Sequence, residues 1–114
     1  MNFVSIRIIT ADVARLVGFY EKTTGLAASW ATPEFATITT GVATLAIGAE
    51  RTVPLATPAT NRSVIVEFLV DDVDALHATL VDVDVAMPPT TMPWGNRSLL
   101  LRDPDGNLVN FFTR

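Results

Sequence analysis

The chain has 114 residues, of which 49% are hydrophobic and 18% are charged, with a formal net charge of −4 and no cysteine. The length suits one globular domain, the composition excludes an intrinsically disordered chain, and the lack of cysteine excludes disulfides, thiolate metal sites and cysteine nucleophiles. The acidic balance with scattered arginines argues against binding to nucleic acid, and no uncharged apolar stretch reaches the ~18 residues that a membrane span needs.

The first half of the chain reads as a strand, a helix and three further strands. Residues 4–9 alternate as a strand does, and they begin so close to Met1 that no signal peptide fits, which predicts a cytoplasmic protein. In the helix that follows, Asp12 is the predicted N-cap, apolar residues recur at helical spacing, and Gly25 marks the end. Three β-like runs separated by turn signals then predict strands over residues 26–31, 35–40 and 43–47.

The second half repeats this order of elements. A segment rich in proline, threonine and asparagine predicts a linker at about 51–62, between module one at about 1–50 and module two at about 63–114. Module two is predicted to hold a helix that begins at the N-cap Asp72. Its strands are predicted over residues 64–70, 83–92, 98–102 and 108–112.

The two halves also share a sequence pattern, because residues 4–13 reappear as residues 64–73. Two copies of a βαβββ module do not make an open array, so we expect them to pair and to bury their apolar faces. The chain is therefore predicted to be one α+β domain, residues 1–114, with two tandem βαβββ modules and a crevice between them. Pairing within one chain and exchange between subunits both satisfy the same strand pattern.

Three motifs in chain order resemble those of one known family. They are Asp-Val-Ala-Arg-Leu-Val-Gly-Phe-Tyr at 12–20, Val-Asp-Asp-Val-Asp-Ala at 70–75, and the run 93–112 with its Asp-Pro-Asp-Gly-Asn turn. Together they resemble the vicinal oxygen chelate superfamily, which includes glyoxalase I, extradiol dioxygenases, fosfomycin-resistance enzymes and bleomycin-resistance proteins. The resemblance implies a curved mixed sheet with a concave cleft, and a homodimer as the functional unit.

Enzymes of this family characteristically hold a divalent metal on the sheet with His, Gln or Glu side chains. The corresponding positions of this chain carry Ser5, Ala46, Ile65 and Asn110. Hydrocarbon side chains cannot bind a metal, and a hydroxyl and an amide without an anionic or imidazole partner would bind one poorly. We therefore predict no metal, no cofactor and no catalytic residue, and we favour a binding protein over an enzyme.

Charged and aromatic residues indicate where a ligand would bind. By strand alternation and by the internal repeat, Arg7 and Glu67 are equivalent residues on the face that the resemblance makes concave, where they could bind a polar ligand or pair with each other. The aromatic residues could line an apolar cleft or serve as plain core, and Trp94, between a proline and a glycine, could contact a ligand or anchor a dimer. The candidate ligand-binding residues are Trp94, Trp30, Arg7, Glu67, Ser5, Asn110, Phe35 and Phe112.

Other titratable residues are expected to have structural roles. His77 lies on the apolar stripe of the second helix, where we expect it to be packed or half-exposed rather than catalytic. Asp71, Asp72 and Asp74 fall at the start of that helix, where negative charge caps the backbone N–H groups and opposes the helix dipole favourably.

The leading hypothesis is a metal-free binding protein of the bleomycin-resistance type, which takes a small organic molecule, aromatic or cationic and antibiotic-like, in an aromatic cleft. One alternative is a lyase- or dioxygenase-type enzyme with atypical metal ligands, for example Glu67 with Asn110 and a carboxylate from a second subunit. A second alternative is a dimeric interaction or sensor domain. We expect a homodimer that binds neither nucleic acid nor membrane.

Overall fold

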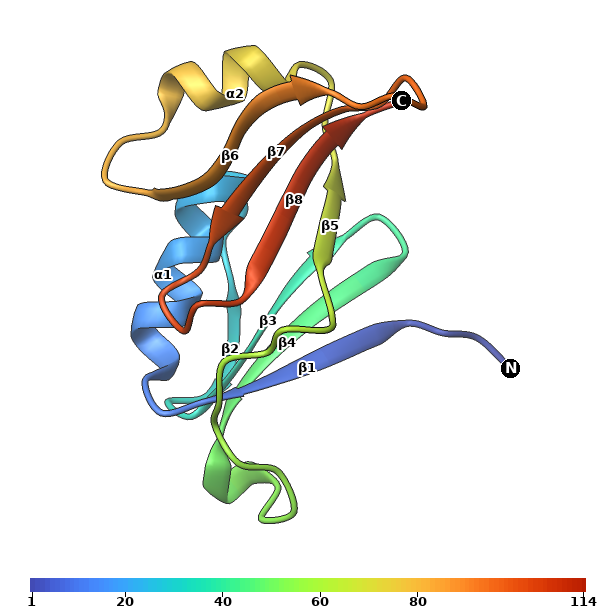
Figure 1. The fold of residues 1–114 in the computed structure, drawn as a ribbon. Helices are drawn as coiled ribbons and strands as arrows, with labels where there is room; N and C mark the ends of the chain where they lie inside the picture. The colour runs from blue at the N-terminus through green and yellow to red at the C-terminus, as the bar shows by residue number, and fades with distance from the viewer. The chain divides into compact units, whose positions relative to one another are not determined.

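The computed structural model describes residues 1–114, which form two compact units. Unit 1 comprises Met1–Ala59 and unit 2 comprises Thr60–Arg114. Each unit contains one α-helix and one four-stranded mixed sheet (Figure 1). The predicted α+β class and the predicted pair of βαβββ modules are therefore confirmed. Neither helix is long and apolar enough to cross a membrane.

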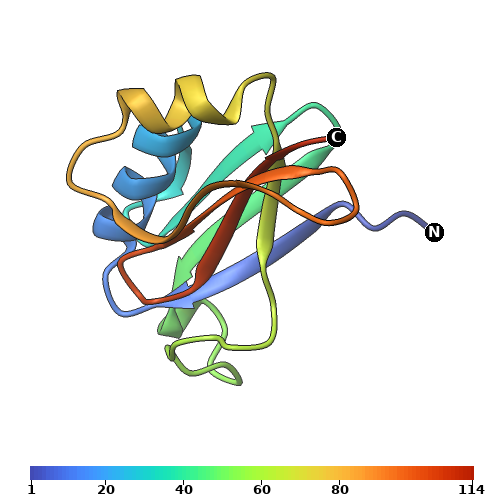
Figure 2. The ribbon, with the colours of Figure 1, turned by 45° about the horizontal axis from the view of Figure 1, so that its top comes forward.

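Unit 1 consists of a strand, a helix and a three-stranded meander. Its elements are β1 (Ser5–Thr10), α1 (Val13–Thr24), β2 (Ser29–Thr32), β3 (Phe35–Thr40), β4 (Ala43–Ala49) and the 3-10 helix η1 (Glu50–Thr52). The strand order is β1-β4-β3-β2, in which β1 runs parallel to β4 and the other neighbours are antiparallel. β1 and β4 lie side by side in both views (Figure 1, Figure 2).

Helix α1 begins and ends at the predicted caps. The Asp12 carboxylate accepts a hydrogen bond from the backbone N of Arg15 at 3.1 Å, and Gly25 is the left-handed C-cap. The apolar stripe of α1 contacts β3 and β4, and this contact forms the core of unit 1. The buried core residues are Val13, Leu16, Val17, Tyr20, Ala36, Ile38, Leu45 and Ile47.

Unit 2 repeats the plan of unit 1. Its elements are β5 (Val66–Leu69), α2 (Val73–Thr79), β6 (Asp84–Thr91), β7 (Arg97–Arg102) and β8 (Leu108–Thr113). The strand order is β5-β8-β7-β6, with β5 parallel to β8 and the other pairs antiparallel. Helix α2 begins at Asp72, whose carboxylate accepts from the backbone N of Ala75 at 2.9 Å, and it packs on β6, β7 and β8 (Figure 1). The predicted N-cap is confirmed.

Strand β2 is shorter than the predicted strand 26–31. The backbone N of Leu26 donates to Thr24 Oγ1 at 3.2 Å, and the backbone N of Ala28 donates to Glu21 Oε2 at 2.8 Å. Because side chains of α1 bind these two amide groups, the chain enters the sheet only after them.

Strand β5 is also shorter than the predicted strand 64–70. The Asn61 side chain accepts hydrogen bonds through Oδ1 from the backbone N of Ser63 at 2.8 Å and from that of Val64 at 3.0 Å. This local turn uses the amide groups that an earlier strand start would need, so the strand begins at Val66.

Candidate functional site

In unit 2, the sheet register brings two predicted site residues together. Glu67 in β5 lies opposite Asn110 in β8, and Asn110 lies opposite Leu100 in β7. Leu69 and Phe112 share this face because they follow Glu67 and Asn110 at the two-residue period of a strand. We call these five residues the Asn110 face. The opposite face carries the buried residues Leu99, Leu101, Val109 and Phe111.

The polar centre of the Asn110 face is a side-chain hydrogen bond. Asn110 Nδ2 donates to Glu67 Oε2 at 2.8 Å. A carboxylate accepts hydrogen bonds but does not donate them, so the amide nitrogen of Asn110, and not its oxygen, must face Glu67. Asn110 is only 9% exposed, and its Oδ1 is buried without a hydrogen-bond partner. A buried acceptor without a partner costs about 1–3 kcal/mol, so this oxygen is a strong candidate for a ligand contact.

The surroundings of this polar centre are mostly apolar, apart from the buried Ser98 opposite Phe112. Leu100 lies across from Asn110, while Phe112 is half-buried and Leu69 is 58% exposed. A few fixed polar groups among apolar side chains are typical of a site for a small organic molecule.

In unit 1, the equivalent face brings together Arg7 and Phe35. The Arg7 Cζ atom lies 5.8 Å from the centroid of the Phe35 ring, within the range of a cation–π contact. Phe35 lies opposite Gly48 in β4, where an added Cβ would come within 3.1 Å of the Phe35 ring and 2.8 Å of Thr52 Oγ1. The glycine therefore leaves the space in which the Phe35 ring lies.

The register also supports the internal repeat residue by residue. Arg7 lies opposite Ala46 in the parallel pair β1–β4, and Glu67 lies opposite Asn110 in the parallel pair β5–β8. Ala46 thus stands where unit 2 has its buried amide. Whether Arg7 and Glu67 pair with each other stays a prediction.

Trp30 and Trp94, which were predicted site residues, lie apart from the Asn110 face and from Arg7 and Phe35. So does Ile65, one of the expected metal-ligand positions. Trp30 lies opposite Ala36, hence on the other face of the sheet from Phe35, and is 44% exposed. Trp94 is 73% exposed in the turn between β6 and β7, outside both sheets. Ile65 precedes β5 and does not belong to the sheet.

The expected metal positions do not offer a metal-binding set of donors. Ser5 lies at the exposed start of β1 and supplies one hydroxyl, Ala46 is buried and supplies none, and Asn110 supplies one neutral amide oxygen, Oδ1. Within residues 1–114, no three His, Cys, Asp or Glu side chains come together as a metal-binding group. These residues do not fit the divalent metal of the resembled enzymes.

An ion pair in unit 2 gives Asp74 a role beyond the predicted helix cap. Arg97 in β7 binds Asp74 in α2 through two hydrogen bonds, Nε to Oδ2 at 2.6 Å and Nη2 to Oδ1 at 2.7 Å. The hydrogen bonds from Arg97 hold the pKa of the Asp74 carboxyl below its usual value, and the same contact raises the pKa of Arg97. The pair therefore joins the helix to the sheet. His77, on the same helix, is half-buried as predicted.

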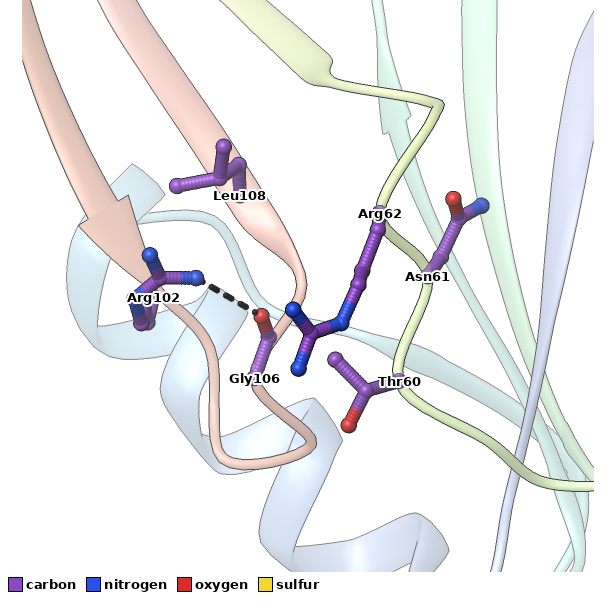
Figure 3. Close-up of a pocket in the computed structure, with 6 residues that line it drawn as sticks. All are labelled: Thr60, Asn61, Arg62, Arg102, Gly106 and Leu108. Atoms are coloured by element: carbon purple, nitrogen blue, oxygen red, sulfur yellow. Dashed lines mark hydrogen bonds between the residues drawn. The ribbon is translucent and has the colours of Figure 1, made fainter.

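No sequence pattern indicated a second group of residues in unit 2. Segment 60–62, predicted as linker, lies against the turn 103–107 and forms a pocket that includes Arg62 and Arg102 (Figure 3). The hydrogen bonds that form it join residues far apart in the chain, so neither periodicity nor local spacing could indicate it.

Comparisons with known proteins agree with this fold. A family model described as "Glyoxalase/Bleomycin resistance protein/Dioxygenase superfamily" matches residues 2–111. A solved structure described as a conserved domain protein is 29% identical, with a TM-score of 0.87 over 99% of this chain and 98% of that chain. A protein of unknown function from Agrobacterium tumefaciens is 25% identical, with a TM-score of 0.84 over 100% of this chain and 94% of that chain. A member of the glyoxalase/bleomycin resistance protein/dioxygenase superfamily from Sphaerobacter thermophilus is 25% identical, with a TM-score of 0.80 over 100% of this chain and 98% of that chain. No curated protein matches the chain.

Proposed function

The chain belongs to the Glyoxalase/Bleomycin resistance protein/Dioxygenase superfamily, and on this premise we propose that it is a metal-free protein that binds a small organic molecule. Proteins with this fold carry out several different reactions, so the function has to be inferred from the side chains of the site. The observation that carries the proposal is Asn110 Oδ1, a buried acceptor without a hydrogen-bond partner beside the Glu67 carboxylate.

The two polar groups favour a particular kind of ligand. A ligand N–H or O–H that donates to Asn110 Oδ1 would remove the cost of leaving that oxygen unpaired. The carboxylate of Glu67 favours a protonated amine over a neutral donor, because a charge-assisted hydrogen bond is stronger. The neighbouring Leu69, Leu100 and Phe112 offer apolar contact. We therefore propose an aromatic or otherwise apolar molecule that carries an amine.

The candidates outside unit 2 are proposed as additional contacts. Arg7 and Phe35 are held against each other and could bind an anionic or aromatic part of the ligand. Trp94 offers an exposed flat side chain. Ser5 is a weaker candidate at the exposed start of β1, and so is Trp30, because it lies on the other face of the sheet from Phe35.

The alternative is a lyase- or dioxygenase-type enzyme with an atypical metal site. The same unpartnered oxygen favours it, because amide and carboxylate oxygens bind hard cations. Asn110 and Glu67 supply only part of the six or so oxygen ligands that such ions take. An organic amine needs no further donor, so binding is the preferred function. An interaction or sensor domain is a third candidate, and it predicts stabilisation by a partner protein.

Thermal unfolding with defined compounds tests the proposal. We expect EDTA-treated protein to be stabilised by benzylamine more than by benzyl alcohol or benzoate, because a ligand that binds only the folded state raises the unfolding temperature. The variant Asn110→Leu should lose this stabilisation and Glu67→Gln should weaken it. Asn2→Leu makes the same chemical change as the first variant in the exposed segment before β1 and should keep the stabilisation. Stabilisation by manganese, nickel or zinc chloride but by no amine would favour the enzyme.

The homodimer and the cytoplasmic location stay predictions. The family resemblance supports the homodimer, and sedimentation equilibrium tests it, since a dimer doubles the apparent mass. Fractionation of the cells that produce the protein tests the compartment.

A further inference from the structure

A pocket in unit 2 contains two arginines that the proposed function does not use. It has a volume of about 470 Å³ and is lined by Thr60, Asn61, Arg62, Arg102, Gly106 and Leu108. Arg102 is the last residue of β7, and Arg62 precedes β5. Figure 3 shows both guanidinium groups extending toward Gly106 from different sides.

Hydrogen bonds fix the two chain segments of this pocket against each other. Thr60 Oγ1 donates to the Asp105 carbonyl at 2.7 Å, and the backbone N of Asn61 donates to Asn107 Oδ1 at 2.8 Å. Asn107 is buried, and its Nδ2 donates to Asp103 Oδ2 at 3.0 Å. The segment that carries Arg62 is thus held against the turn that follows Arg102. This lowers the conformational entropy that the pocket would lose when a ligand binds.

Gly106 permits this close approach. Its φ of 85° lies in the left-handed region, and an added Cβ would lie 3.1 Å from Thr60 Cγ2 and 3.3 Å from Thr60 Oγ1. A larger residue would push the turn away from Thr60 and would open the pocket.

The charges of the pocket favour an anion. The ion pair within unit 2 joins Arg97 and Asp74, so neither pocket arginine takes part in it. Arg102 uses one donor in a long hydrogen bond of 3.4 Å from Nη1 to the Gly106 carbonyl, which leaves its other donors available to a ligand. The Asp103 carboxylate accepts from backbone N–H groups inside the turn.

Acidic residues near the pocket oppose anion binding, namely Asp103 and Asp105 in the turn and Asp84 in β6. Asp84 in β6 lies opposite Arg102 in the strand register and is exposed. No acidic residue lines the pocket itself, whereas Arg62 and Arg102 both do, and solvent screens the exposed Asp84 carboxylate.

We propose that this pocket binds an oxyanion, the phosphate or carboxylate group of a small molecule, between Arg62 and Arg102. Guanidinium groups match both anions because their planar N–H donors bind two oxygens at once. The pocket exceeds the size of the bare ion, and Leu108 offers apolar contact to the rest of such a molecule. Arg102 and Leu108 lie on the same face of the sheet as Leu100 and Asn110, two residues away along their strands, so the two sites adjoin but use different polar groups.

Titration of the ¹⁵N-labelled full chain with sodium phosphate, and separately with sodium acetate, tests the proposal at constant pH and ionic strength. We expect saturable shifts of the backbone amide signals of Asn61 and Gly106. Arg62→Gln and Arg102→Gln should each weaken the affinity about tenfold or more, as expected for a charged hydrogen bond. Arg114→Gln removes the same charge at the exposed C-terminal residue and should leave the affinity unchanged.

The two anions identify the ligand group. Saturation by phosphate alone supports a phosphate site, and saturation by both supports a general oxyanion site. The variant Asn110→Leu should keep phosphate affinity even if amine binding fails, which separates this proposal from the proposed function. The proposal would be overturned if neither phosphate nor acetate gave saturable shifts. It would also be overturned if Arg114→Gln lost as much affinity as Arg62→Gln and Arg102→Gln.

Discussion

At the scale of single residues, Asn110 is where stability and binding are expected to oppose each other. Its Oδ1 is buried without a partner, whereas the partner of its Nδ2, Glu67, is exposed and can be hydrated when the amide is removed. Asn110→Leu keeps a similar side-chain volume and removes the unpaired acceptor. We therefore expect the free energy of unfolding to rise by about 1 kcal/mol while amine binding is lost.

Urea unfolding of both proteins at neutral pH measures this difference. Ala46, the equivalent residue in unit 1, indicates that the paired strands do not need a polar side chain at this register. A loss of stability greater than about 1 kcal/mol in the variant would mean that the amide mainly serves the fold.

Gly48 gives a second prediction at this scale. An added methyl group would come within 3.1 Å of the Phe35 ring and 2.8 Å of Thr52 Oγ1, so both side chains would have to move. We expect Gly48→Ala to lower the free energy of unfolding by about 1–3 kcal/mol, the usual cost of overpacking. Loss of the Arg7 contact should accompany it.

The matched control for this variant is Gly18→Ala in α1. Gly18 is exposed, and an added Cβ there meets no atom within 4 Å. Because alanine has the higher helix propensity, this change should raise the free energy of unfolding by up to about 1 kcal/mol. Equal effects of the two changes in chemical denaturation would contradict the role given to Gly48.

At the scale of elements, the contact between α2 and β7 predicts a pH dependence of stability. Arg97 lowers the pKa of Asp74 in the folded state. The pair therefore contributes stability above the usual carboxyl pKa of 3.8, and this contribution is lost as the pH falls through the lower folded value. The effect is modest, because both side chains are partly exposed.

A double-mutant cycle isolates this contribution. The coupling between Asp74→Asn and Arg97→Gln, measured by urea unfolding, should be present at neutral pH and should decline below pH 3.8. Addition of salt should also reduce it. A coupling that stays constant between neutral and strongly acidic pH would show that the ion pair does not cause it.

Much of the element order could be predicted from the sequence. Asp12 and Asp72 cap their helices as expected, because N-capping depends on residues close together in the chain. The sequence also predicts that Arg7 and Glu67 are equivalent. Each lies in a strand with alternating residues, at the same distance before the helix that follows. Arg7 lies opposite Ala46, and Glu67 lies opposite Asn110 at the equivalent place of the second unit.

The features that escaped prediction depend on side chains or on distant residues. The β2–β3 pairing has an irregularity next to Trp30, and Trp30 lies on the other face from Phe35. Asn61 turns the chain through its own side chain and delays β5. The Arg62–Arg102 pocket depends on bonds from segment 60–62 to a turn far along the chain. Composition alone could not reveal these contacts.

At the scale of the whole molecule, the chain combines a family fold with unusual side chains at the expected metal positions. The family match covers residues 2–111, yet those positions hold a hydroxyl, hydrocarbons and an amide bound to a carboxylate. A fold of this kind can serve binding without a Lewis acid, because shape and a few fixed polar groups suffice. We therefore propose that the chain binds an organic amine without a metal.

Native mass spectrometry of the EDTA-dialysed full chain tests this claim most directly, with benzylamine as the ligand. We expect one organic molecule per chain, no bound metal mass, and loss of the complex in Asn110→Leu but not in Asn2→Leu. A complex that forms only after manganese, nickel, iron or zinc is restored at one ion per chain would contradict it.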